Sequence, residues 1–332
     1  MNARTATVAV TGIGGFVGRH VALALLREGY PVHGTVRALG RVEEIERSIR
    51  AAGGTDAARL TFGEADLLEE RGWAEAFAEV SYVVHTASPF PARLPANEDD
   101  LIGPARDRTL RVLRAAHAAG AKRVVLTSSV AAVIYGAGRA PFTEDDWTDP
   151  QSSLATPYYR SKTFAERAAW DCAADSGLEL VVINPGMVLG PVLGHEIGTS
   201  VAVVRNLLKG NYPALPKFAV PVVDVRDVAD AHVQALSVAA AAGERFLIAG
   251  EALPLRISRP SSGAGSLNMR AGFRGSRCPI GWQGLPPPSM RACASSCANS
   301  GMTPAFPTKR RAVFSHGSRA LPKRPSWPRR TA

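Results

Sequence analysis

A tyrosine and a lysine stand four residues apart, at Tyr158 and Lys162, in a stretch whose periodicity predicts a helix over residues 157–176. This spacing places both side chains on one face of the helix, one turn apart. We expect the lysine cation to favour the phenolate and to lower the tyrosine pKa from its usual value of about 10. Tyr158 would then exchange a proton near neutral pH, as a general acid or base does.

Two serines, Ser128 and Ser129, follow an apolar run at residues 123–127 that predicts a strand. Parallel α/β sheets bind their ligands at the carboxyl ends of the strands, so these serines are placed where a substrate would bind. A serine hydroxyl there can hydrogen-bond a substrate carbonyl and polarise it. Position alone separates the two serines poorly, and a Y-x-x-x-K pattern by itself is also common on amphipathic surface helices.

A glycine-rich turn follows the first apolar run, in the sequence V-A-V-T-G-I-G-G-F-V-G at residues 8–18. Gly12 permits the sharp turn, Gly15 lets backbone N–H groups approach phosphates, and Gly18 lets the helix pack on the strand. An apolar run before the glycines and helical periodicity after them are the context that this motif requires. The pattern predicts a strand–turn–helix unit that binds the pyrophosphate of a dinucleotide.

Apolar strand patterns alternate with helical patterns along most of the chain. The expected strands are 7–10, 32–36, 60–64, 82–85, 123–127, 179–184 and 245–249. The expected helices are 15–28, 41–52, 72–79, 97–119, 157–176 and 225–241. Such alternation with short turns predicts a parallel sheet covered by helices on both faces. The handedness of crossovers then favours a doubly wound, Rossmann-type α/β fold.

Charge is unevenly distributed along the chain. The 332 residues carry a formal net charge of +10, but residues 256–332 hold 14 of the 39 Lys and Arg residues and none of the 29 Asp and Glu residues. Residues 1–255 therefore carry a net charge of −4. We expect a dinucleotide-binding domain over residues 1–255 and a basic, low-order tail over residues 256–332.

The segment 256–332 has three interpretations. Its Ser, Gly, Pro and Arg content without an apolar stripe is typical of a disordered basic tail, which would bind acidic partners weakly. Cys278, Cys293 and Cys297 with His316 would form a metal site, but they contain no C-x-x-C pair. The third interpretation is a reading-frame error in a GC-rich gene, since out-of-frame GC-rich codons yield Arg, Pro, Ser and Gly and few carboxylates. We favour this hypothesis, which translation of the DNA in the other two frames tests.

Other classes of function are disfavoured. No apolar run reaches the roughly 18–20 residues of a membrane helix, and the first predicted strand starts too early for a signal peptide, so we expect a cytoplasmic protein with no membrane partner. His85, His117 and His232 lack metal-ligand spacing, so we expect no metal. The cations of the segment 256–332 are scattered among Pro and Gly, so we expect no specific binding of nucleic acid.

The residues after the second predicted strand, 32–36, favour a phosphorylated cofactor. NAD-specific sheets place an Asp or Glu near this point to bind the ribose 2′-hydroxyl. Here Arg37 follows the strand, Arg41 comes close behind it, and the first acid is Glu43. A guanidinium binds a 2′-phosphate through paired charge-assisted hydrogen bonds. We therefore expect NADP(H), with NAD as the less favoured cofactor.

Eight sequence blocks, in order, carry a resemblance to a known family. They are T-G-I-G-G-F-V-G at 11–18, T-V-R at 35–37, A-D-L at 65–67, V-V-H-T-A-S-P at 83–89, V-L-T-S-S at 125–129, Y-Y-R-S-K at 158–162, N-P-G-M-V-L-G-P at 184–191 and V-D-V-R-D-V-A-D-A-H at 223–232. From about residue 7 to residue 250 the chain resembles the extended short-chain dehydrogenase/reductase superfamily. Within its NAD-dependent epimerase/dehydratase family, the chain is most similar to the branch of dihydroflavonol 4-reductase and cinnamoyl-CoA reductase.

This resemblance implies catalysis by Ser129, Tyr158 and Lys162, with Ser129 preferred because the family uses the second serine of the pair. The residues implied for cofactor binding, together with Tyr158 and Lys162, are Thr11, Gly12, Gly14, Gly15, Phe16, Val17, Gly18, Arg37, Asp66, Leu67, Ala87, Ser88, Pro185, Gly186 and Val188. The implied reaction is hydride transfer between NADPH and the carbonyl carbon of a small aldehyde or ketone substrate.

Further expectations follow from the resemblance. The family builds a substrate lobe from the region matching 186–222 and from C-terminal helices; because the segment 256–332 departs from that pattern, we expect an incomplete lobe. Helices 97–119 and 157–176 would form a homodimer interface. One alternative is an NAD-dependent nucleotide-sugar epimerase or dehydratase, which Arg37 and the apolar residues 130–132 disfavour. The other is an NAD(P)-binding protein whose catalysis is impaired by the altered tail.

Overall fold

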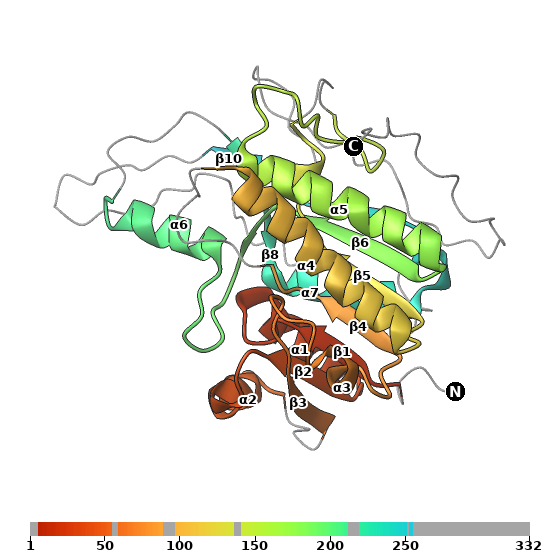
Figure 1. Ribbon diagram of the computed structural model, residues 1–332. Coiled ribbons are helices and arrows are strands. Elements are labelled where there is room, and N and C mark those ends of the chain that lie inside the picture. Colours follow the sequence, from red (N-terminus) through yellow and green to blue (C-terminus); the bar gives the residue numbers. More distant parts are fainter. Residues whose placement is uncertain are drawn as a thin grey trace, which may run out of the picture.

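The computed structural model describes residues 6–54, 59–88, 97–135, 141–211, 219–250 and 252–254. Its centre is a seven-stranded sheet in the order β3-β2-β1-β4-β5-β6-β9, with every pair of neighbours parallel (Figure 1). The strands are β1 Val8–Thr11, β2 Val32–Val36, β3 Leu60–Glu64, β4 Tyr82–His85, β5 Arg123–Thr127, β6 Glu179–Pro185 and β9 Arg245–Ile248. This confirms the predicted Rossmann-type sheet.

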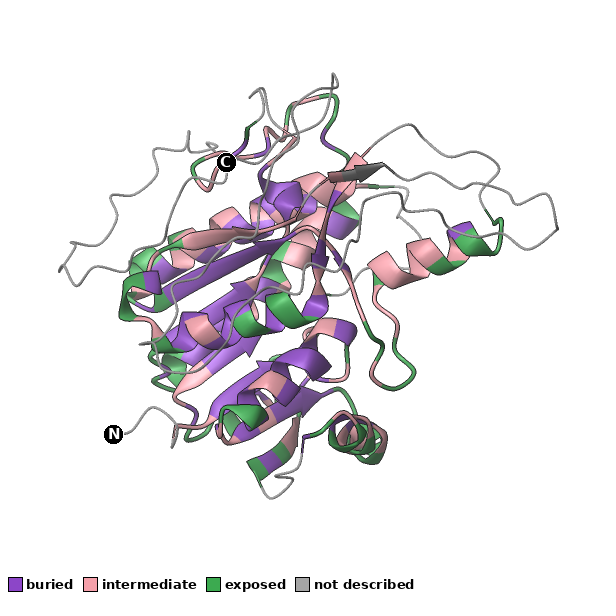
Figure 2. Ribbon diagram, turned by 180° about the vertical axis from the view of Figure 1, so that it is seen from behind, coloured by how far each residue is buried: buried purple, intermediate pink, exposed green. Residues whose placement is uncertain are grey.

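Helices cover both faces of this sheet, because its strands are apolar on both sides. The helices are α1 Phe16–Arg27, α2 Val42–Ala51, α3 Trp73–Ala76, α4 Asp99–Ala118, α5 Pro157–Ser176, α6 Thr199–Leu208 and α7 Val225–Ser237. Val8 and Val10 join one core with α1, α2 and α7, whereas Ala9 joins the other core with α3, α4 and α5. Figure 2 shows the buried strands between these layers.

The strand register brings the turns that follow β1, β4 and β5 to one edge of the sheet. Thr11, the last residue of β1, is level with His85, the last residue of β4, and His85 is level with Leu126 of β5. The glycine turn, the residues after β4 and the serines after β5 therefore lie at neighbouring carboxyl ends, where ligands bind in such folds.

A second, three-stranded sheet in the order β10-β8-β7 was not among the predicted elements. It contains β7 Met187–Leu189, β8 Ala219–Asp224 and β10 Ala252–Pro254, and α6 projects beside it in both views (Figures 1 and 2). The strands of three residues are too short to show a period, which explains why the sequence pattern did not predict them. β8 runs into α7, whose N-cap Asp224 accepts a hydrogen bond from the backbone N–H of Arg226 over 2.8 Å.

Some predicted bounds need correction. The expected helix 225–241 ends at Ser237 and is followed by a 3₁₀ turn at Ala239–Ala241. The expected helix 72–79 is a single turn, Trp73–Ala76, because Phe77 already leaves the helical conformation at φ −109° and ψ 6° and Glu79 follows at φ 60°. The segment 256–332 with its cysteines and His316, part of the expected lobe (212–218) and Gly136 lie outside the described residues. The division at residue 255 stays a prediction.

Candidate active site

The turn after β1 is shaped so that only glycine fits at two positions. Gly12 has φ +69°, and a Cβ there would lie 2.8 Å from Ala87 Cα. A Cβ at Gly18 would lie 2.3 Å from the carbonyl oxygen of Gly12, so the first turn of α1 packs directly on the glycine turn. Gly15 donates its backbone N–H to that same oxygen over 2.9 Å. The predicted tight turn and close helix packing are both present.

The N-terminus of α1 is suited to an anion. Gly15 caps the helix in an extended conformation, no side chain caps it, and its first turn holds no acidic residue. The unpaired N–H groups and the helix dipole therefore favour a negatively charged ligand at this end. Phe16 is buried and Val17 packs beside it, in a small cluster with Val188 and Val223.

Thr11 links the ends of β1 and β4. Its hydroxyl oxygen lies 2.7 Å from Nδ1 of His85, and its carbonyl accepts a hydrogen bond from the Thr86 hydroxyl over 2.7 Å. The backbone N–H of Ala87 donates to the Thr11 hydroxyl over 3.4 Å. Burial lowers the pKa of His85 to about 3, so this ring is neutral and acts as a structural element.

Arg19 is fully buried and is hydrogen-bonded to the glycine turn. The sequence pattern did not predict this role. Arg19 on α1 donates to the carbonyl of Gly14 over 3.1 Å and to both carboxylate oxygens of Glu44 over 2.8 and 2.7 Å. It also donates to the Ser48 hydroxyl over 2.6 Å. The hydrogen bond from Arg19 lowers the pKa of Glu44. The charged pair fixes α2 against α1 and orients the Gly14 peptide.

A cavity of about 570 Å³ opens beside this turn. It is lined by Gly14, Gly15, Thr35, Val36, Arg37, Ala38, Arg41, Ile45, Asp66 and Glu196. The structure thus brings Gly14 and Gly15 together with Arg37 and Asp66, whereas Gly12 and Gly18 do not line the cavity. The guanidinium of Arg37 is exposed and no described residue pairs with it, whereas Arg41 pairs with Glu196.

Asp66 and Leu67, although adjacent in sequence, differ in position. Oδ1 of Asp66 accepts the backbone N–H of Leu68 over 2.9 Å, which leaves the carboxylate at the cavity wall. The Leu67 side chain packs on the core beside α3 and α4, and its carbonyl accepts a hydrogen bond from Arg111. Leu67 does not line the cavity.

The two neighbouring serines make different contacts. The side chains of Ser129 and Tyr158 are hydrogen-bonded to each other, and Ser129 also caps the 3₁₀ turn Val130–Ala132 by accepting from the Ala131 backbone N–H over 3.1 Å. Ser128 is buried, and its hydroxyl donates to Oε2 of Glu166 over 2.5 Å. The structure therefore places Ser129, rather than Ser128, with Tyr158.

Lys162 lies one turn beyond Tyr158 on α5, with its Nζ 6.0 Å from the centre of the Tyr158 ring. Its ammonium donates to the Ser88 hydroxyl over 2.6 Å, which connects α5 to the residues after β4. Burial lowers the pKa of Lys162 to about 8, and the carboxylate of Glu166 opposes that shift.

One electrostatic prediction was wrong. The sequence spacing predicted that Lys162 would lower the pKa of Tyr158, but removal of the phenol from water raises that pKa. The hydrogen bond with Ser129 opposes the rise, and the charge interaction with Tyr159 adds to it. Burial disfavours the phenolate more strongly than a lysine about one helical turn away favours it. Tyr158 is therefore a protonated hydrogen-bond partner in this structure.

A buried polar network under the site was not predicted. Asn184 donates its amide to Oε2 of Glu166 over 2.7 Å and to the Ser129 carbonyl over 3.1 Å. The other carboxylate oxygen of Glu166 lies 2.8 Å from Nε of Arg245, whose guanidinium stacks on Trp147 at 3.7 Å. Glu166 is four residues after Lys162, and this spacing places the two side chains on one face of α5. It is the sequence signal from which Glu166 could have been found. Arg245 gave no signal, because it lies in an apolar strand pattern.

The residues after β6 form the junction between the two sheets. The Gly186 backbone N–H donates to the carbonyl of Ile248 over 3.0 Å, and a Cβ at Gly186 would lie 2.4 Å from the Pro221 carbonyl. Pro185 ends β6, and Val188 is buried in β7. These positions lie outside the cavity described above, on the part of the chain that connects the main sheet to the smaller one.

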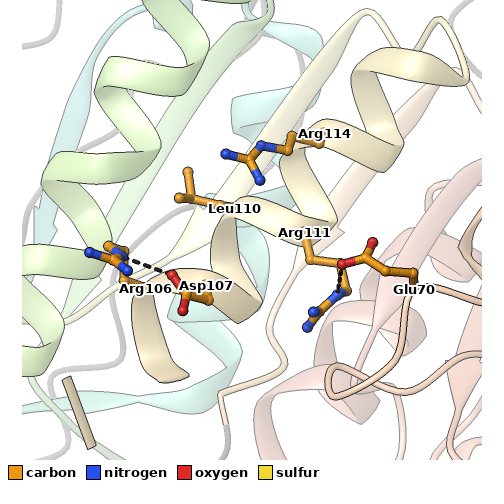
Figure 3. A pocket seen from close by; sticks show the side chains of 6 residues that line it. All are labelled: Glu70, Arg106, Asp107, Leu110, Arg111 and Arg114. Atoms are coloured by element: carbon orange, nitrogen blue, oxygen red, sulfur yellow. Dashed lines mark hydrogen bonds and ion pairs between the residues drawn. The ribbon is translucent and has the colours of Figure 1, made fainter. Parts of the chain in front are cut away.

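A second cavity, of about 500 Å³, shares no residue with this site (Figure 3). It is lined by Glu70, Arg106, Asp107, Leu110, Arg111 and Arg114. Arg106 pairs with Asp107, and Arg111 pairs with Glu70, so two of its three cations are already neutralised. Its residues come from α4 and from the segment between β3 and α3, and we assign no ligand to it.

Within the described residues, no three His, Cys, Asp or Glu side chains are grouped as a metal site requires. No described helix combines the length and the apolar character needed to cross a bilayer. His232 is buried, with Nε2 2.7 Å from the Thr127 hydroxyl oxygen and Nδ1 2.7 Å from the Val228 carbonyl.

Comparison with known proteins agrees with this geometry. The pattern of the NAD dependent epimerase/dehydratase family matches residues 8–249. The chain belongs to this family. It is 37% identical to cinnamoyl-CoA reductase CAD2 of Medicago truncatula over 248 residues, which cover 73% of this chain and 75% of that protein. It is 34% identical to dihydroflavonol 4-reductase of Zea mays over 245 residues, which cover 71% and 68% of the two chains.

A solved structure adds the cofactor of a relative. Yeast methylglyoxal/isovaleraldehyde reductase Gre2, complexed with NADPH, superposes with a TM-score of 0.63 and 30% identity. The match covers 75% of this chain and 79% of the yeast protein. The family resemblance predicted from the sequence is confirmed, and this family member is of the cinnamoyl-CoA and dihydroflavonol reductase kind.

Proposed function

We propose that this chain is an NADPH-dependent reductase that transfers hydride to the carbonyl of a small aldehyde or ketone. The observation that carries the proposal is the hydrogen bond between Ser129 and Tyr158, with Lys162 one turn away, at the sheet edge that also holds the glycine turn. The reductases among its relatives, and the yeast reductase complexed with NADPH, support the same reaction class.

The residues at the cavity fit a phosphorylated dinucleotide. The uncapped N-terminus of α1 and the backbone of Gly14 and Gly15 would hold the pyrophosphate. Arg37 would bind the 2′-phosphate, and Asp66 would accept the adenine amine. When bound, the cofactor supplies the hydride, and the protein supplies binding and position.

Ala87 and Ser88 would line the middle of the cofactor, and Pro185, Gly186 and Val188 would lie against its nicotinamide. Lys162, which already donates to Ser88, would donate to the nicotinamide ribose from the same position. Phe16 and Val17 pack in one cluster with Val188 and would support it in this position. Thr11, Gly12 and Gly18 would act by shaping the turn.

At the reacting carbonyl, Ser129 would hold the oxygen and Tyr158 would donate a proton to it. The raised pKa of Tyr158 keeps the phenol protonated, so it can act as the donor in the direction of reduction. Lys162 would place positive charge near the oxygen as negative charge develops there. The network of Glu166 and Asn184 would hold the Ser129 backbone in position for this step.

Kinetics of Tyr158→Phe test this assignment. We expect turnover of methylglyoxal or isovaleraldehyde with NADPH to fall by about 10³-fold, since the proton donor is lost. NADPH affinity should stay within a few-fold of wild type. Tyr82→Phe is the matched control, because Tyr82 begins β4 and is level with the first residue of β1, at the opposite edge of the sheet from the site. Turnover like that of wild type in the Tyr158 variant would refute the assignment.

The alternative sugar-nucleotide epimerase would retain its cofactor through the catalytic cycle. The dipeptide Tyr135-Gly136, which follows the serines, is similar to the sequence of such epimerases and dehydratases. However, Val130, Ala131 and Ala132 form a buried apolar turn where a sugar dehydratase needs acidic residues. NAD that copurifies with the protein would favour the alternative over the reductase. Binding of NADPH without any carbonyl reduction would instead favour an NAD(P)-binding protein with impaired catalysis. The altered segment 256–332 would then explain the loss of activity.

A further inference from the structure

A short connection from the smaller sheet reaches over to the cofactor cavity. We call residues 193–198, between β7 and α6, the strap. Gly194 has φ +77°, and a Cβ there would lie 2.2 Å from Nη1 of Arg19 and 2.6 Å from Oε1 of Glu44. The backbone of His195 is hydrogen-bonded to the Glu44 carboxylate. The strap therefore packs on the ion pair of Arg19 and Glu44, and Arg19 also contacts the glycine turn.

The next residue of the strap carries a carboxylate to the cavity. Glu196 is one of the residues that line it, and Oε1 of Glu196 lies 2.7 Å from Nη2 of Arg41. Both side chains are about half exposed, at 45% for Arg41 and 48% for Glu196. Arg37, on the same wall, has no partner among the described residues. One of the two cations at the cavity is thus neutralised by a residue 155 positions away in the chain.

We propose that Glu196 is a cofactor-selectivity residue that restrains the affinity for the 2′-phosphorylated dinucleotide. The proposal rests on the proposed function, since it concerns the same cavity. A 2′-phosphate bound at Arg37 and Arg41 must either displace the Glu196 carboxylate from Arg41 or lie beside it. Displacement breaks the ion pair, and a position beside the carboxylate brings two negative charges together, so each lowers the binding affinity. A carboxylate at this place can instead accept the ribose 2′-hydroxyl of NAD, as acids do in NAD-specific sheets.

The exposure of the pair sets the size of the effect. Exposed ion pairs contribute little, so release of Arg41 from Glu196 should improve binding by about five-fold. Removing the negative charge beside a phosphate dianion adds to this gain. NAD⁺ has no 2′-phosphate, so its binding gains neither from the release of Arg41 nor from the removal of the negative charge. The ratio of the NADP⁺ affinity to the NAD⁺ affinity therefore rises. Arg37, which pairs with no other residue in the described part of the chain, supplies the basal preference.

Calorimetric titration of the full chain with NADP⁺ and with NAD⁺ tests the proposal. In Glu196→Gln we expect NADP⁺ to bind about 3–10-fold more tightly, while NAD⁺ binds equally or more weakly. Glu43→Gln is the matched control, since Glu43 is an exposed carboxylate that pairs with Arg47 and does not line the cavity. It makes the same change in net charge and should leave the ratio unchanged.

The variants Arg41→Ala and Arg41→Ala/Glu196→Gln complete a double-mutant cycle. The gain from Glu196→Gln should be smaller in the Arg41→Ala background, because the contribution from release of Arg41 is lost and only the removal of the negative charge beside the phosphate remains. An unchanged ratio in Glu196→Gln, an equal gain in Glu43→Gln, or a gain that is as large without Arg41 as with it would each overturn the proposal. Absence of binding of either nucleotide to wild type and Glu196→Gln would overturn it too.

The two proposals fail in different ways. If NADP⁺ binds and carbonyl reduction proceeds but Glu196→Gln leaves the affinity ratio unchanged, the selectivity proposal alone fails. If the ratio rises as expected but no aldehyde or ketone is reduced, the catalytic proposal fails and the assignment of Glu196 holds.

Discussion

The hydroxyl of Ser128 donates to Oε2 of Glu166 over 2.5 Å, so it is directed into the interior of the protein. The next residue, Ser129, directs its hydroxyl toward Tyr158. Extended backbone alternates side chains between the two faces, and this alternation separates two neighbouring serines that the sequence pattern could not distinguish. Ser128 is thereby held in the buried network with Glu166, and Ser129 is the serine that we propose to contact the substrate.

Substitution of each serine by alanine should therefore give different results. We expect Ser129→Ala to lower kcat/KM for reduction by at least about 100-fold, because a donor to the carbonyl oxygen is lost. Ser128→Ala should cost about 1–3 kcal/mol of unfolding free energy, since Glu166 loses a buried hydrogen bond. Steady-state kinetics and urea unfolding separate these effects. A larger loss of activity in Ser128→Ala than in Ser129→Ala would contradict the account.

Lys162 should set the alkaline limit of the reaction. Its pKa is lowered to about 8 by burial, so the free enzyme loses this charge as the pH rises through that value. We expect kcat/KM for NADPH to be constant below about pH 7 and to fall about tenfold per unit well above pH 8. Tyr158, whose pKa is raised, stays protonated over this range. In Lys162→Arg the charge persists, so the fall should move to higher pH; an unchanged profile would exclude Lys162 as its source.

His232 should make the protein sensitive to acid. Burial lowers its pKa to about 4, from 6.5 in the unfolded chain, so the unfolded state binds the proton more readily. Its contribution to stability is full above pH 6.5 and is lost as the pH falls from 6.5 to about 4. His232→Gln should lower the slope of unfolding free energy against pH in this window by up to about 1.4 kcal/mol per unit.

The exposed histidine of α4, His117, provides the control for that measurement. His117→Gln makes the same change of residue type at an exposed position, and its slope is the reference for that of His232→Gln. Denaturant unfolding at a series of pH values supplies both slopes. Equal slopes in wild type and His232→Gln would show that His232 is already protonated in the folded protein.

Gly18→Ala should damage the cofactor turn directly. The added methyl group would lie 2.3 Å from the Gly12 carbonyl oxygen, so the turn or α1 must move. We expect a loss of about 1–3 kcal/mol in unfolding free energy and weaker NADPH binding. Gly40→Ala is the matched substitution, since a Cβ there would have no atom of the described residues within 4 Å. Similar stability losses in both variants would mean that the close packing of Gly18 on Gly12 is unimportant.

The main sheet was predictable because its central strands β1, β4, β5 and β6 are largely buried and form apolar runs between glycines and helices. β2, β3, β4 and β5 have the predicted bounds, and β1 is shifted by one residue. The smaller sheet was not predictable in this way. β7 and β10 have three residues each, and their pairing with β8 joins segments that are distant in sequence.

The burial and pairing of charged side chains were harder to predict from the sequence than the positions of the glycines. Arg19 is an arginine on a helix, a residue type that is almost always solvated, yet it is fully buried because Glu44 on another helix pairs with it. The direction of the Tyr158 pKa shift was missed for a related reason. Spacing along a helix shows which charge is near, whereas desolvation depends on what the rest of the chain packs around the phenol.

The most direct test of the account is a parallel fluorescence titration of the 332-residue chain with NADPH and NADH, repeated for Arg37→Ser. We predict micromolar binding of NADPH by wild type, clearly weaker binding of NADH, and loss of that difference in Arg37→Ser, since the exposed guanidinium of Arg37 lines the cavity. Addition of isovaleraldehyde to the NADPH complex should then oxidise the bound cofactor. Absence of NADPH binding, or a preference for NADH that is unaffected by Arg37→Ser, would contradict the account.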